Sequence, residues 1–307
     1  MGTQVVTLVE VKGRAGGHVC PRGAVGEITV APQDNFHSYH ARFADGTEAS
    51  LRRQEFAVRK HHQAGELLQS VDNLSDFNLC DHIIYSCVVG SRAYGLDEDV
   101  SDVDRRGIYL PPAEMHWSLY GVPEQLENKS AEECYWELQK FLTLALKANP
   151  NVLECLYTSM VEKATPLAQE LLDMRSAFLS KLIYQTYNGY VLSQFKKLEQ
   201  DLRNRGEIRW KHAMHLIRLL LEGISVLKSG FLQVWMDEHR EKLLAIRRGA
   251  ASWEEVNAWR LALHRDFDAA LAITRLPERP EYEKVNAFLI HARRVSAEQA
   301  GGSLNED

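Results

Sequence analysis

Hydrophobic and polar positions change their period along the chain. Residues 1 to about 62 contain short alternating runs separated by glycine turns, such as HSYHARFADG. Within this run Asp45-Gly46 predicts a tight hairpin turn, because glycine readily takes the positive φ angles that such a turn requires. The alternation would bury one face of each strand. We therefore expect a small β-barrel over residues 1–65, and its strand pattern resembles that of SH3-like barrels.

A second pattern, from about residue 76 onward, combines buried strands with one helix. HIIYSCVVG predicts a buried strand that runs into a turn at Gly90, and DVDRRGIYL predicts a second strand that ends at two prolines. Residues 132–148 have apolar positions at helical spacing and predict an amphipathic helix, which Asn149-Pro150 would end. We expect these elements to form one mixed domain over residues 66–160.

Beyond residue 160 almost every segment has a helical period, as in WKHAMHLIRLLLEGISVLKSG. Gly230 is placed to end one helix, and Ser252 with Glu255 has the spacing of a capping box at the start of the next. Residues 161–307 are therefore expected to form a helical domain. The whole pattern predicts an α+β protein: a mixed sheet, a C-terminal helical bundle and the small N-terminal barrel.

Composition narrows the class of protein. The 307 residues are 45% hydrophobic and 25% charged, as in a soluble globular protein, and the net charge of −6 requires any nucleic-acid contact to use local basic patches. The five cysteines are scattered, without the spacing of a zinc site, and are expected to be reduced thiols. No apolar run approaches the ~20 residues of a membrane span and no secretory signal is evident, so we expect a cytoplasmic protein without membrane contact.

The segment CVVGSRAYGLDEDVSDVDRRGIYL carries the candidate chemistry. Residues two apart on a strand point the same way, so Asp102 and Asp104 would project side by side. Their like charges call for a cation, and Mg²⁺ combines carboxylates with substrate phosphates, with Mn²⁺ as the alternative ion. Two such ions ~3.5–4 Å apart can hold both oxygens of an in-line displacement, which is the chemistry of nucleotidyl transfer.

Gly90 and Ser91 are expected to meet the phosphates. Glycine lets the backbone approach phosphate oxygens closely, and the serine adds a hydroxyl donor followed by backbone N–H groups. If RAYGL opens a helix, its N-terminus would favour the same anion. A lone D-x-D on a solvated strand or a lone G-S in a turn would mean little, but their order around a short polar loop is much more specific.

This arrangement resembles the nucleotidyltransferase superfamily typified by DNA polymerase beta, with its h-G-S-x-x-x-G and D-h-D signatures. GSRAYGLDEDVSDVDRRGIYLPP looks particularly like the bacterial and phage nucleotidyltransferases associated with RNA-repair gene clusters. ANPNVLECLYT, WKHAMHLIRLLLEG and TRLPERPEYEKVNAFLI also look like later parts of that family. The resemblance covers roughly residues 80 to 295 and omits the barrel.

The resemblance implies a third carboxylate that binds the catalytic metal and helps to deprotonate the acceptor hydroxyl. Glu132 is the first choice, where the family usually has aspartate, and Glu133 is the close rival. The alternative is that both glutamates merely enrich the first turn of a helix. The metal ligands are thus expected to be Asp102, Asp104 and Glu132.

Lys211, His215 and Arg218 fall on one face of a predicted helix. They could bind a nucleotide phosphate or an RNA backbone, and the alternative is an outward polar stripe paired with neighbours. Tyr187 and Tyr190 could stack on a base, but core packing is the favoured interpretation.

Three functions compete. The first is metal-dependent transfer of a nucleoside monophosphate from a triphosphate to a hydroxyl, with release of pyrophosphate. The resemblance favours an RNA end as acceptor, and a protein side chain or a small molecule stays open. The second is a nucleotide- or nucleic-acid-binding adaptor with a degenerate site. The third is an antitoxin that nucleotidylylates a partner protein. The preferred nucleotide, the oligomeric state and the role of the barrel stay open.

Overall fold

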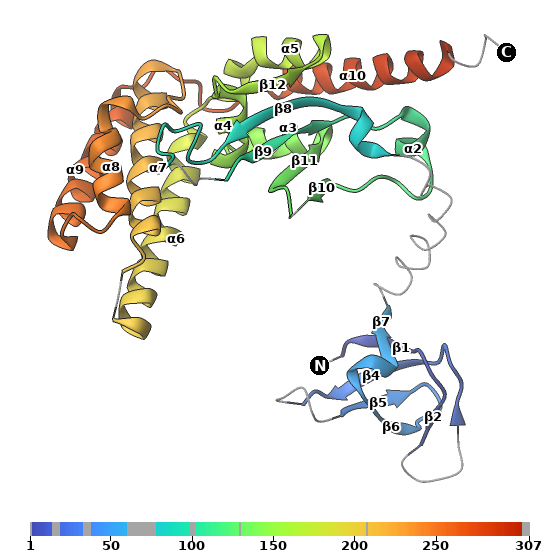
Figure 1. The fold of residues 1–307 in the computed structure, drawn as a ribbon. Helices are drawn as coiled ribbons and strands as arrows, with labels where there is room; N and C mark the ends of the chain where they lie inside the picture. Colours follow the sequence, from blue (N-terminus) through green and yellow to red (C-terminus); the bar gives the residue numbers. More distant parts are fainter. Residues whose placement is uncertain are drawn as a thin grey trace. The chain divides into compact units, whose positions relative to one another are not determined.

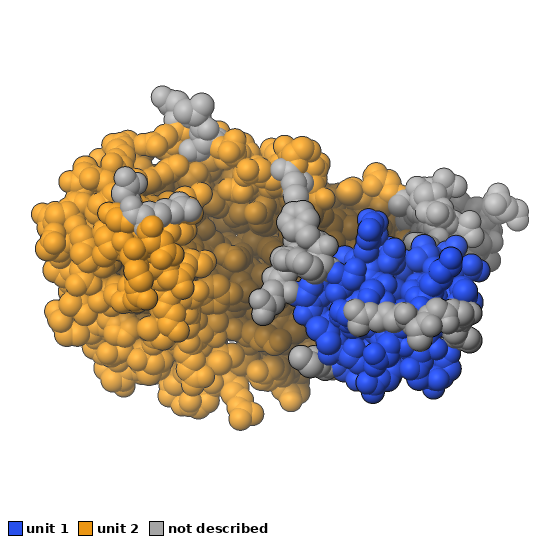
Figure 2. Space-filling model, turned by 90° about the horizontal axis from the view of Figure 1, so that it is seen from below, with its two compact units in different colours: residues 1–77 blue, residues 78–307 orange. Residues whose placement is uncertain are grey.

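The chain forms two compact units, 1–77 and 78–307, coloured separately in Figure 2 and described here one at a time. The computed structural model describes residues 2–13, 19–32, 38–59, 78–98, 102–128, 130–206 and 208–302. The predicted boundary between residues 65 and 66 lies outside these residues. The predicted boundary between 160 and 161 falls inside the second unit, whose sheet and helices share one hydrophobic core.

The first unit is a β-structure with its own small core. Its strands are β1 (Gln4–Thr7), β2 (Val11–Lys12), β3 (Val19–Cys20), β4 (Val25–Val30), β5 (Tyr39–Phe43), β6 (Glu48–Leu51) and β7 (Phe56–Val58), with a short 3-10 helix η1 (Arg53–Glu55) before β7. The predicted hairpin is confirmed: β5 pairs antiparallel with β6, and Gly46 between them has φ 84°. Ala41, Ala49 and Leu51 are fully buried, so the alternation of the two strands does bury one face.

The predicted SH3-like barrel is not confirmed. Five strands form one antiparallel sheet in the order β6-β5-β4-β1-β7, and β2 with β3 forms a separate two-stranded sheet. Within the described residues of this unit, the outer strands β6 and β7 do not pair with each other, so the sheet is open.

The second unit is built around a mixed five-stranded sheet, shown in Figure 1. Its order is β10-β11-β9-β8-β12, and β11 with β9 is its parallel pair. The strands are β8 (Ile83–Val89), β9 (Asp104–Tyr109), β10 (Gln125–Asn128), β11 (Glu133–Glu137) and β12 (Val161–Ala164). The two buried strands predicted around the G-S and D-x-D motifs are confirmed as β8 and β9, but β9 begins at Asp104, so Asp102 precedes the strand instead of lying in it.

The helix predicted over residues 132–148 is wrong in its first part. Residues Glu133–Glu137 form β11, and the helix α3 spans only Leu138–Leu146. The side chains of β11 alternate, and its backbone pairs with β9 on one side and β10 on the other, so tertiary pairing overrides the apparent helical period. Asn149 then caps the next helix, α4 (Pro150–Tyr157), by accepting from the N–H of Asn151.

The rest of the unit is largely helical, as predicted. The helices are α2 (Ala113–Trp117), α5 (Pro166–Asp173), α6 (Leu182–Arg205), α7 (Trp210–Ser229), α8 (Arg240–Arg247), α9 (Trp253–Ile273) and α10 (Tyr282–Gly302), with 3-10 turns η3 (Leu79–His82), η4 (Arg175–Phe178) and η5 (Asp237–His239). Gly230 ends α7 in the left-handed conformation, and Ser252 with Glu255 forms the capping box of α9. Both predicted caps are confirmed. Helices α6 to α9 gather beyond the end of the sheet at which β8 ends (Figure 1).

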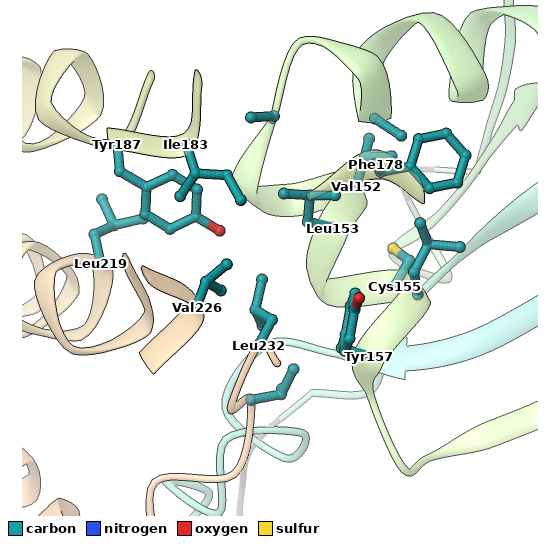
Figure 3. Packing of buried hydrophobic residues seen from close by; sticks show 14 of the residues in the cluster. Val152, Leu153, Cys155, Tyr157, Phe178, Ile183, Tyr187, Leu219, Val226 and Leu232 are labelled. Atoms are coloured by element: carbon teal, nitrogen blue, oxygen red, sulfur yellow. The ribbon is translucent and has the colours of Figure 1, made fainter. Parts of the chain in front are cut away.

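A continuous core joins the sheet to these helices. Figure 3 shows Leu153 of α4 and Leu219 of α7 on facing helices, with Tyr187 of α6 pointing between them. Tyr187 is fully buried, which confirms core packing over base stacking for this residue. None of the helices in the described part of the chain combines the length and the apolar character that a membrane span requires.

Candidate active site

Gly90 and Asp104 meet at the point where β8 ends and β9 begins. The two strands pair antiparallel, with Val89 opposite Asp104, so the residue after Val89 lies beside the Asp104 side chain. A Cβ atom on Gly90 would lie 2.5 Å from Oδ2 of Asp104, and Gly90 has φ 74°, a left-handed conformation. Both the close approach and the backbone angle therefore require glycine here.

Glu132 lies next to Asp104 because it precedes the strand that runs parallel to β9. In that pairing Glu133 lies opposite Arg105, so Glu132 is level with Asp104. Glu132 itself has φ 53°, a strained angle for a residue other than glycine. A hydrogen bond with the Asp104 carboxyl group raises the pKa of Glu132, and the charges of Asp104 and Asp102 raise it further. Three acidic side chains thus interact at one end of the sheet.

The neighbouring charged residues separate the two rival glutamates. Arg105 pairs with Glu162 at 2.9 Å and lies 3.9 Å from Glu133, so Glu133 belongs to a different ion-pair group from Asp104. Arg106 has a guanidinium nitrogen 3.7 Å from Asp104 and donates to the backbone carbonyl of Glu132 at 2.7 Å. Arg106 thereby fixes the strained turn at Glu132 and offsets part of the negative charge.

The segment that follows Gly90 is a series of tight turns and not the start of a helix, contrary to the expectation for RAYGL. Three of its N–H groups donate to carbonyl groups within the same segment: Tyr94 to Gly90, Gly95 to Arg92, and Leu96 to Ser91 at 2.8 Å. The glycine at position 95 has φ 69°, which breaks the helical path. We call residues 90–96 the Gly-Ser loop.

The helical half of the unit holds this loop by its carbonyl groups. Met236 donates its N–H to the carbonyl of Tyr94 at 3.0 Å, Arg240 donates to Gly95 at 2.7 Å, and Arg247 donates to Leu96 at 2.7 Å. The indole of Trp235 also lies against Gly95, where a Cβ atom would approach it to 2.8 Å. The loop conformation is therefore set by the segment around η5 and α8 as well as by β8.

Among the described residues, no group of three or more His, Cys, Asp or Glu side chains is already arranged to hold a metal ion. In the acidic set at the end of the sheet, Glu132 shares a hydrogen bond with Asp104 and interacts with Asp102 through its charge. Carboxylates this close to one another repel, so the set favours a cation between them.

A family model described as the RNA repair pathway DNA polymerase beta family matches residues 57–291. The chain belongs to this family. It is thus a member of the DNA polymerase beta superfamily of nucleotidyltransferases linked to RNA repair. It is also 29% identical over 144 residues to the uncharacterized protein YcgL of Bacillus subtilis (strain 168), and this match covers 45% of the chain and 54% of YcgL. The chain thus spans about half the length of that curated relative.

The predicted basic trio lies on α7, in the part of the chain that the family match covers, but its members differ in exposure. Lys211 is exposed, His215 is partly buried, and Arg218 is 1% exposed. Arg218 donates to His215 Nδ1 at 2.8 Å, so this nitrogen accepts and the neutral ring carries its proton on Nε2. Burial and the charge of Arg218 lower the pKa of His215 to about 3, so the ring is neutral at physiological pH.

Reasoning from the sequence missed three residues that contact Arg218. Glu154 of α4 accepts a hydrogen bond from Arg218 at 2.6 Å, and Glu222 of α7 forms a second ion pair with it. The ring of Tyr94 lies 3.8 Å from the guanidinium carbon, and its hydroxyl donates to Glu154. The four-residue spacing of Arg218 and Glu222 was a readable signal, because such pairs meet on a helix face. Nothing local marked Glu154 or Tyr94 as their partners.

Proposed function

We propose that the chain transfers a nucleoside monophosphate from a nucleoside triphosphate to the hydroxyl at an RNA end. The acceptor oxygen forms a new bond to the α-phosphorus, the bond from that phosphorus to the β-phosphate oxygen breaks, and pyrophosphate leaves. The observation that carries this proposal is the contact of the Asp104 carboxylate with Gly90, beside Glu132. It brings the acidic residues and the Gly-Ser loop of a nucleotidyltransferase family to one point.

The acidic set supports Mg²⁺, with Mn²⁺ as the alternative. Mg²⁺ usually keeps several waters and takes one or two carboxylates plus substrate phosphates, so a complete protein cage is not needed. Asp102, Asp104 and Glu132 would hold the ions, and their mutual repulsion, seen in the raised pKa of Glu132, would be relieved by them. When bound, such ions neutralise charge that develops on the phosphates.

The protein groups around this set suit the triphosphate. The Gly-Ser loop would bind phosphate oxygens through the Ser91 hydroxyl and its backbone, since glycine leaves room for a close approach. Lys211 and His215 are proposed to contact phosphate, of the nucleotide or of RNA, through an ammonium group and an Nε2–H donor. Glu132 would accept the proton of the acceptor hydroxyl, a task that requires a carboxylate on the same side as Asp104.

The test is a transfer assay with a triphosphate labelled in its α-phosphate. The full chain is incubated with Mg²⁺ and RNA oligonucleotides that end in free 3′-hydroxyl groups, and label in RNA is measured together with pyrophosphate. Asp104→Asn keeps the size of the side chain and is expected to abolish transfer. Asp173→Asn, on an exposed position of α5, is the matched control and is expected to leave transfer unchanged.

Label in RNA that is lost in Asp104→Asn alone supports the proposal. Label that appears in protein instead of RNA would overturn an RNA end as the acceptor, while the transfer of a nucleoside monophosphate would stand. Binding of the triphosphate without any transfer would overturn the enzymatic proposal and favour an adaptor.

A further inference from the structure

Beneath the Gly-Ser loop lies a buried group of charged and polar side chains, Tyr94, Glu154, Arg218 and Glu222, which we call the loop anchor. Arg218, Glu154 and Glu222 are 1%, 2% and 0% exposed. Burial raises the pKa of Glu222 well above its usual range, as does the neighbouring Glu154, although Arg218 opposes the shift. This charge group therefore lies inside the hydrophobic core, between α4 and α7.

Stability alone is a poor explanation for the loop anchor. Burying an arginine with two carboxylates removes all three from water, and apolar side chains of similar volume often stabilise a core at least as well. Such a group instead orients its hydrogen-bond partners, because a guanidinium and a carboxylate hold them at set distances and angles. The partner that connects this group to the Gly-Ser loop is Tyr94, which is itself a residue of the loop.

Tyr94 is held on both its side chain and its backbone. Its ring lies over Arg218, its hydroxyl donates to Glu154, its carbonyl accepts from Met236, and its N–H donates to Gly90 at 3.2 Å. The last bond ends on Gly90, the residue on which an added Cβ would meet the Asp104 carboxylate. A short path of contacts thus runs from the buried charges through Tyr94 to the acidic residues.

We propose that Tyr94, Glu154, Arg218 and Glu222 are positioning residues that hold the Gly-Ser loop in the conformation that binds the triphosphate. Arg218 then acts through Tyr94, which differs from the nucleotide-binding role expected from the sequence. The nucleotide part of this inference rests on the proposed function. The loop-holding part does not.

The first experiment measures amide hydrogen exchange over residues 90–98 by mass spectrometry, in the full chain without metal or nucleotide. Tyr94→Phe keeps the ring over Arg218 and removes only the hydroxyl. It is expected to speed exchange at the loop about tenfold, since a bond to a charged group is lost. Tyr184→Phe is the matched control, because its hydroxyl also donates to a carboxylate, Asp268, at 2.7 Å, but outside the loop anchor.

Faster exchange in Tyr94→Phe and not in Tyr184→Phe supports the inference. Unchanged exchange in Tyr94→Phe overturns the inference, whether or not the chain transfers nucleotides. Glu154→Gln keeps the shape of the side chain but also removes the charge that pairs with Arg218, so it is expected to speed exchange at the loop at least as much as Tyr94→Phe. Melting temperatures establish that all three variants are folded.

The second experiment measures KM for the triphosphate in the transfer assay. Tyr94→Phe is expected to raise KM about tenfold, and the effect should disappear when Ser91→Ala is already present, because the hydroxyl would act only through the loop. Additive effects in the double variant would overturn the positioning role. If the unmodified chain transfers no nucleotide, the proposed function fails, and the exchange experiment still decides whether the anchor holds the loop.

Discussion

Gly90→Ala is the substitution whose effect follows most directly from the geometry. The added Cβ would lie 2.5 Å from Oδ2 of Asp104, where ordinary contacts are ~3.5 Å or more, so the carboxylate has to move by roughly 1 Å. A misplacement of about 1 Å in a group that orients reactants costs on the order of 100-fold in rate. In addition, alanine at φ 74° costs about 1–2 kcal/mol of stability.

Gly121→Ala separates these two effects. Gly121 has φ 63°, but nothing lies within 4 Å of a Cβ atom placed on it, so it has the same backbone cost without a new contact. Both variants are expected to lose about 1–2 kcal/mol in urea unfolding. Only Gly90→Ala is expected to lose roughly 100-fold in kcat/KM of the transfer assay. Equal kcat/KM in the two variants would refute the assignment of Asp104 to the reacting centre.

Three further predictions concern the site and its supports. Glu132→Gln is expected to reduce kcat at least about tenfold more than Glu133→Gln, because Glu132 interacts with Asp104 whereas Glu133 lies beside Arg105. Equal losses in the single-turnover rates of the two variants would contradict this. In the folded chain the pKa of His215 is about 3, whereas in the unfolded chain it is 6.5. As the pH drops below 6.5, the unfolded chain therefore binds a proton that the folded chain does not, and stability falls by about 2 kcal/mol at pH 5. His215→Gln should remove that difference between urea unfolding curves at pH 5 and pH 7.5, and an unchanged difference would refute the shift. Gly95→Ala should destabilise the protein by about 1–3 kcal/mol through contact with the Trp235 ring, and Trp235→Leu should recover part of the loss in thermal unfolding; additive losses would argue against the contact.

Local patterns predicted the local structure well. The strands on either side of the G-S and D-x-D motifs, the hairpin at Gly46, the end of α7 at Gly230 and the capping box at Ser252 follow from side-chain period and from glycine and cap chemistry. Each of these signals spans only a few neighbouring residues, so the sequence alone is enough to identify it. The family assignment has the same origin, because its motifs are short and specific.

Features that depend on distant partners could not be predicted in the same way. Residues Glu133–Glu137 look helical in isolation and become a strand because β9 and β10 pair with them. Arg218 looks like a ligand of phosphate on its own helix, yet its carboxylate partner Glu154 comes from α4, 64 residues earlier in the chain. Closure of the first unit into a barrel likewise depends on pairing between outer strands, which strand patterns do not determine.

The central claim is that Asp104 and its acidic neighbours bind a divalent cation together with the triphosphate held by the Gly-Ser loop. The most direct measurement is Mn²⁺ binding, followed by electron paramagnetic resonance, in the presence of a triphosphate analogue that cannot be cleaved between its α- and β-phosphates. We expect the unmodified chain and the Asp173→Asn control to bind Mn²⁺ with the analogue, and Asp104→Asn to lose this binding. Equal Mn²⁺ binding by Asp104→Asn would contradict the claim.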